Sequence, residues 1–144
     1  VTDVQLTLGY HRILAISGGY AAHSDAIYRL ADYLDEQGYT APVTLDWGID
    51  APVRFLTQGR VQPVDVFGYD RLDAPDAGFG ERIAPYAADW QTIYLAHAPD
   101  KAVFKGRVEA MAEVASAMRF RWLEQLRVSQ RSGEPLFIVH RLQD

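Results

Sequence analysis

Length, composition and charge exclude several classes of protein at the outset. The chain has 144 residues, 49% of them hydrophobic, which is enough for one compact domain with a buried core. A net charge of −5 with scattered basic residues argues against a nucleic-acid partner, and the lack of cysteine excludes disulfides and thiolate metal sites.

The N-terminal half is predicted to alternate strands and helices. Ser24 is a suitable N-cap, Gly38 a suitable end, and the apolar residues between them recur at helical spacing. The predicted elements are, in order, a strand at 12–17, a helix at 24–37, a strand at 41–46, a helix at 51–58 and a strand at 64–67.

The C-terminal half is predicted to continue this pattern and then to change it. Pro85 should keep one helix short or kinked, and Gly133 supplies the turn of a hairpin. The predicted elements are a helix at 80–88, a strand at 92–96, a helix from 101 or 106 onward, and two strands at 120–130 and 135–142.

This order of elements predicts an α/β fold, a three-layer Rossmann-like open sheet that is mostly parallel. Right-handed crossovers place helices on both faces and give the strand order 3-2-1-4, with the C-terminal hairpin adding an antiparallel strand beyond strand four. In such a sheet, ligands bind where the carboxyl ends of the strands meet and the winding reverses.

A set of polar and aromatic residues follows the predicted strands at that edge. Glycine, imidazole, carboxylate and aromatic groups all occur there, which makes the edge the candidate ligand-binding site. Its residues are Gly18, Gly19, Tyr20, His23, Asp46, Trp47, Tyr69, Asp70 and His97.

Three functional interpretations of this edge stay open. A phosphate could bind the glycine loop while Asp46 contacts a ribose, although SGGYAAHS lacks the G-x-G-x-x-G spacing. His23, Asp46 and His97, with Asp25 as a further candidate, are suitable for a metal or for proton transfer, although no local ligand pair supports this.

The third interpretation is a sugar or partner site, with Tyr20, Trp47 and Tyr69 as flat apolar platforms. A purely structural interpretation stands beside all three, because glycines also turn the chain and histidines also bond to loop carbonyls. The nucleophile-elbow pattern G-x-S-x-G is absent, so a serine hydrolase is not predicted.

A resemblance adds to this edge-based prediction. The run HSDAIYRLADYLDEQGYTAPVTLDWGIDAPVRFLTQGRVQPVDVFGY, followed by TIYLAHAP and PLFIVHRL, resembles the soluble C-terminal region of bacterial membrane glycosyltransferases. These enzymes are similar to the dolichyl-phosphate-mannose protein mannosyltransferase family. The similarity covers most of the chain and centres on LDWGIDAP.

The resemblance implies an extracytoplasmic accessory domain. Such enzymes use a polyprenyl-phosphate sugar, and their catalytic carboxylates lie in a membrane portion, so no catalytic residue, cofactor or metal is assigned here. The expected partners are the membrane-embedded part of the same protein and a glycan or protein acceptor. Because the chain starts at Val1, we expect 1–144 to be a single domain from a longer protein. The alternative is a free-standing Rossmann-like nucleotide-binding domain or enzyme that uses Gly18, Gly19 and Asp46.

Overall fold

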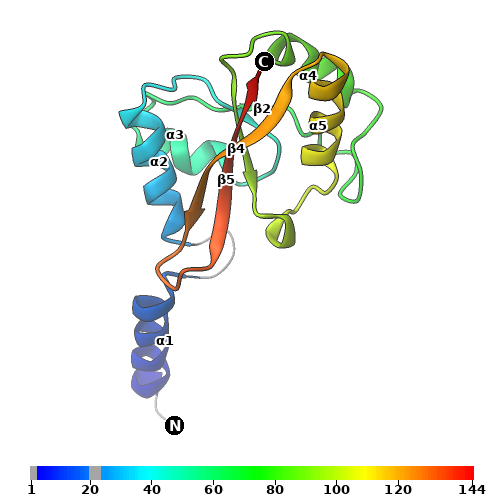
Figure 1. Cartoon of the computed structure of the whole chain (residues 1–144). Coiled ribbons are helices and arrows are strands. Elements are labelled where there is room, and N and C mark those ends of the chain that lie inside the picture. Colours follow the sequence, from blue (N-terminus) through cyan, green and yellow to red (C-terminus); the bar gives the residue numbers. More distant parts are fainter. Residues whose placement is uncertain (1–2, 20–23) are drawn as a thin grey trace.

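The computed structural model describes residues 3–19 and 24–144, and within them five strands form one sheet with helices on both faces (Figure 1). The elements are α1 (Asp3–Ser17), α2 (Ala26–Glu36), β1 (Val43–Thr44), α3 (Asp50–Leu56), β2 (Val64–Asp65), α4 (Phe79–Ala87), β3 (Ile93–His97), the 3₁₀ turn η2 (Pro99–Lys101), α5 (Arg107–Ala117), β4 (Arg121–Ser129) and β5 (Pro135–Gln143).

The sheet is open and mixed, with the strand order β2-β1-β3-β5-β4. Strands β2, β1 and β3 are parallel, and the β4–β5 hairpin joins β3 through an antiparallel pairing. The α/β class, the parallel first part and the C-terminal hairpin are therefore confirmed. The predicted Rossmann order is not, because β1 pairs directly with β3 and no strand lies between them.

The prediction of a first strand at 12–17 is wrong, because these residues belong to helix α1. A strand needs a hydrogen-bonded neighbour, and the central position that it would occupy is closed by the β1–β3 pairing. The helix ends where the Gly18 N–H donates to the Leu14 carbonyl at 2.9 Å. Gly18 has φ 82°, the left-handed conformation that terminates many helices.

One face of the sheet is covered by α2 and α3. Helix α2 buries an apolar stripe that includes Leu30 and Leu34, and α3 contributes Val53. These side chains pack with Leu95 of β3 and Val139 of β5. The helical periodicity of the sequence therefore located α2 correctly.

The opposite face is covered by α4 and α5, which lie on the other side of the sheet in Figure 1. Ile83 of α4 and Met111 of α5 pack with Tyr94 of β3 and Leu142 of β5. Pro85 lies inside α4, which is nine residues long, in agreement with the predicted short helix. The first turn of α5 faces the ends of β1 and β3 and forms part of the candidate site.

Candidate functional site

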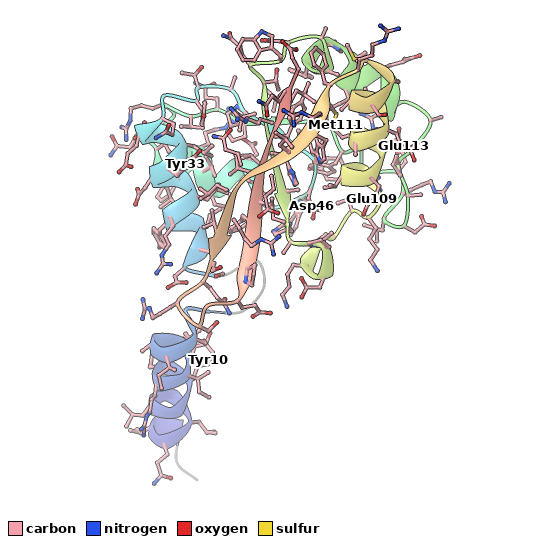
Figure 2. All side chains as sticks on the ribbon, in the orientation of Figure 1. Tyr10, Tyr33, Asp46, Glu109, Met111 and Glu113 are labelled. Carbon is pink, nitrogen blue, oxygen red and sulfur yellow. The ribbon has the colours of Figure 1, made fainter. Side chains whose placement is uncertain are left out.

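A pocket of ≈ 310 Å³ lies where β1 and β3 end, between the hairpin strands and the first turn of α5. Its buried floor includes Asp46, His97, Phe104 and His140, and its exposed rim carries Lys105, Glu109, Glu124 and Arg127. Figure 2 shows Asp46 and Glu109 at the same end of the interface between the sheet and α5. We refer to these two groups as the floor and the rim.

Asp46 is a buried carboxylate with all of its partners in place. The Leu45 N–H donates to the Leu95 carbonyl at 2.8 Å, which continues the β1–β3 pairing and holds Asp46 beside the end of β3. The Trp47 and Phe104 N–H groups donate to Oδ1 at 2.8 and 2.9 Å, and the Val103 N–H donates to Oδ2 at 3.0 Å. Asp46 thereby ties the strand end to the segment that leads into α5.

His97 completes the set of donors to Asp46. Its Nδ1 lies 2.8 Å from Asp46 Oδ2, and because a carboxylate only accepts, Nδ1 carries a hydrogen and donates it. The ring also packs on Phe137, with 5.1 Å between centroids. Asp46 therefore orients the ring through Nδ1 and leaves Nε2 as its second polar atom.

His140 lies on the same floor in a different environment. Its ring stacks on Trp122 at 4.6 Å with an interplanar angle of 16°, and only 7% of the residue is exposed. Burial lowers the pKa of His140 from 6.5 to about 4, so the imidazole is neutral at pH 7. Its Nδ1 is buried without a hydrogen-bond partner among the residues that the structure describes.

Arg107 holds the wall of the pocket that is formed by the start of α5. Its buried guanidinium donates to the carbonyls of Phe67 at 3.0 Å, Lys105 at 2.8 Å and Arg71 at 2.6 Å. Burial lowers the pKa of Arg107, and the charges of Asp76 and Asp46 oppose this shift. The guanidinium therefore stabilises this wall of the pocket through bonds to backbone carbonyls.

The first turn of α5 leaves backbone donors at the pocket. Gly106 precedes the helix with φ 80°, has no side chain to cap it, and would bring a Cβ within 3.0 Å of Pro75. The Ala110 N–H donates back to the Gly106 carbonyl at 3.0 Å. The N–H groups that precede Ala110 in the helix have no acceptor within it, as at any helix start.

The structure brings together two of the predicted site residues, Asp46 and His97. Trp47 is 48% exposed and Tyr69 is 65% exposed, and neither lines the pocket. The Tyr69 ring packs at 4.9 Å from that of Phe67, on the loop that follows β2. Asp70 is exposed on the same loop.

The glycine pair lies apart from this pocket. Gly18 and Gly19 follow helix α1 and face a separate hollow that includes Asp25 and Arg131. A Cβ on Gly18 would come within 2.6 Å of the Asp25 carboxyl carbon, and its φ of 82° is one that side chains rarely adopt, so a substitution there is strained. Tyr20 and His23 lie outside the described residues. The nucleotide interpretation loses its geometric basis, because the glycines follow a helix and the Asp46 carboxylate is fully engaged.

The sequence-based prediction missed His140 and the rim residues Glu124 and Arg127. All three belong to the hairpin, and only the register of β3, β5 and β4 places them beside the parallel strand ends. A usable signal was the histidine in the apolar run PLFIV, because an imidazole in a buried strand calls for a partner.

Across residues 3–19 and 24–144, no group of three or more histidine, aspartate or glutamate side chains is arranged to hold a metal ion. In the same ranges, no helix has the length and apolar character needed to cross a bilayer. Comparison with known proteins gave no matching family model, no similar curated protein and no similar solved structure.

Proposed function

We propose that this chain is a non-catalytic accessory domain of a membrane glycosyltransferase that uses a polyprenyl-phosphate sugar donor. In this proposal the domain lies on the extracytoplasmic side of the membrane and contacts the membrane-embedded part of the same protein. Two features support it: the resemblance of the sequence around LDWGIDAP and the exposed apolar surface of helix α1. The second of these carries the structural argument.

Helix α1 exposes large apolar side chains along its whole length. Single exposed apolar residues are common on soluble proteins, but contiguous apolar surface marks a contact with protein or lipid. Six large apolar side chains of this one helix are each between 61% and 66% exposed: Val4, Leu6, Leu8, Tyr10, Ile13 and Ile16.

The attachment of α1 explains why this surface stays uncovered. Figure 1 shows the helix projecting from the body beside the hairpin turn. Arg131 donates to the Ala15 carbonyl, and the Ser132 N–H donates to the Ser17 carbonyl at 3.3 Å. Contacts at its C-terminal end therefore hold the helix, while its exposed apolar side chains can contact a partner. An apolar, membrane-embedded segment is the partner that such a surface suits.

Labelling in whole cells tests the proposed location. Because the chain has no cysteine, Ser116→Cys on the exposed side of α5 introduces a single thiol within it. We expect the complete gene product, with any other cysteines replaced, to sediment with membranes. We also expect a membrane-impermeant maleimide to label it in intact cells.

The unsubstituted cysteine-free protein is the matched control and should stay unlabelled. Lysis in detergent must expose Ser116→Cys to the same reagent, which shows that the thiol is reactive. Recovery in the soluble fraction, or labelling only after lysis, would contradict the proposed location.

A further inference from the structure

The two histidines on the pocket floor determine what kind of ligand the pocket suits. His97 gives its Nδ1 hydrogen to Asp46, so Nε2 is the nitrogen of that ring left for a ligand. His140 lines the same pocket, and its imidazole is neutral at pH 7. A neutral imidazole has one nitrogen that donates and one that accepts, so it pairs with groups that can do both.

A hydroxyl group suits both histidines, whereas a phosphate does not. A hydroxyl both donates and accepts, so it can pair with the imidazole nitrogens and with the backbone N–H groups at the start of α5. A fully ionised phosphate only accepts, and beside His97 it would lie close to the buried carboxylate of Asp46, which repels it. The pocket therefore favours a ligand with several hydroxyl groups over a bare anion.

The charged side chains of the rim also favour a neutral ligand with several hydroxyl groups. Glu124 and Arg127 form an ion pair at 2.7 Å, and Lys105 and Glu109 add one charge of each sign. Carboxylates accept from hydroxyl groups and cations donate to them, while the balance of charge gives no net attraction for an anion. Both signs at the rim suit a neutral polyol.

The apolar part of the lining and the volume limit the ligand further. Phe104 and Ile138 line the pocket beside the histidines, which offers contact to C–H groups of a ring. A volume of ≈ 310 Å³ lies at the small end of ligand pockets, so it suits about one ring. These features describe a site with polar groups placed against apolar walls.

We propose that this pocket binds one pyranose ring, with hydroxyl groups bonded to His97 Nε2 and to His140. The inference rests on the proposed function for the origin of the sugar, and it deepens that function by assigning one sugar ring to this pocket. The contacts themselves rest on the pocket and do not involve helix α1.

Titration of the purified chain by ¹⁵N NMR tests this inference, with the methyl glycosides of glucose, galactose and mannose as probes. We expect millimolar binding of at least one glycoside, with shifts at residues of the pocket. His140→Phe keeps the stacked ring and removes the nitrogens, so it should weaken binding about tenfold. His11→Phe on α1 is the matched control and should bind like the parent chain.

A second pair of variants tests the rim. Glu109→Gln should weaken binding, whereas Glu113→Gln, one turn further along α5 in Figure 2, should leave it unchanged. The spectrum of each variant reports whether it is folded.

Three results would overturn the inference: no binding of any of the three glycosides, equal binding by folded His140→Phe, or saturable binding of inorganic phosphate alone. The last would mark an anion site. A failed glycoside titration would not change the labelling result, and a cytoplasmic location would not exclude sugar binding. The two proposals can therefore fail separately.

Discussion

His97 and His140 line the same pocket, and their surroundings differ in a way that separates two uses of a buried histidine. Both are more than nine-tenths buried, and both pack on an aromatic ring. His97 is bonded to a carboxylate that three backbone N–H groups also contact, whereas Nδ1 of His140 has no partner within the described ranges. The first arrangement stabilises the fold, and the second costs stability.

The largest expected effect comes from removing the carboxylate under His97. Asp46→Ala leaves the N–H groups of Val103 and Phe104 and the His97 ring without their acceptor, and the bonds from Phe104 and His97 are buried. We expect the free energy of unfolding to fall by about 3–5 kcal/mol, measured by urea denaturation. Asp46→Asn keeps an acceptor oxygen and should lose less.

Asp70→Ala is the matched control, because Asp70 is an exposed aspartate on the loop after β2. Its effect should stay within about 0.5 kcal/mol. Equal losses in the two alanine variants would show that the bonds to Asp46 contribute nothing specific.

The next effect is a dependence of stability on pH that belongs to His140. Burial lowers its pKa to about 4, while the unfolded chain titrates near 6.5. Between these values the unfolded state binds the extra proton, so the free energy of unfolding should fall as the pH drops. The full loss is about 3 kcal/mol.

Comparison of the parent chain with His140→Phe isolates this contribution. Glu124 and Arg127 face His140 from β4 and act on its pKa in opposite directions, and both stay in the variant. The difference in the free energy of unfolding between the two proteins should change steeply from pH 6.5 to pH 4. A constant difference would mean that His140 does not titrate in this way.

The contrast also shows which parts of the site the sequence could predict. Asp46 and His97 follow strands that the apolar runs located, and parallel strand ends meet at one edge, so their contact was predictable. His140 lies within β5, and its place in the pocket depends on its pairing with Tyr94 and Glu124. That pairing is set by contacts across the sheet, which no local pattern encodes.

Helices α1 and α2 show why one sequence-based prediction of the fold was confirmed and another was wrong. In α2 apolar residues recur on one face that includes Leu30 and Leu34, and this period identifies a helix. In α1 apolar residues lie all around the helix, so residues 12–17 alone resembled a buried strand. A short apolar run does not distinguish the two structures, because the distinction depends on what covers it.

The smallest expected effect comes from replacing each of the two histidines with phenylalanine. This pair of variants is also the most direct test of the contrast between His97 and His140. His97→Phe removes a bond to a buried carboxylate and should lower the free energy of unfolding by about 2 kcal/mol at pH 7.5. His140→Phe removes a buried nitrogen that has no partner in the described chain and should raise it by about 1 kcal/mol. Thermal and urea unfolding of the two variants measure the signs. Because the residue exchange, the pocket and the degree of burial are shared, opposite signs would isolate the hydrogen-bond partner as the cause, and equal signs would refute the distinction.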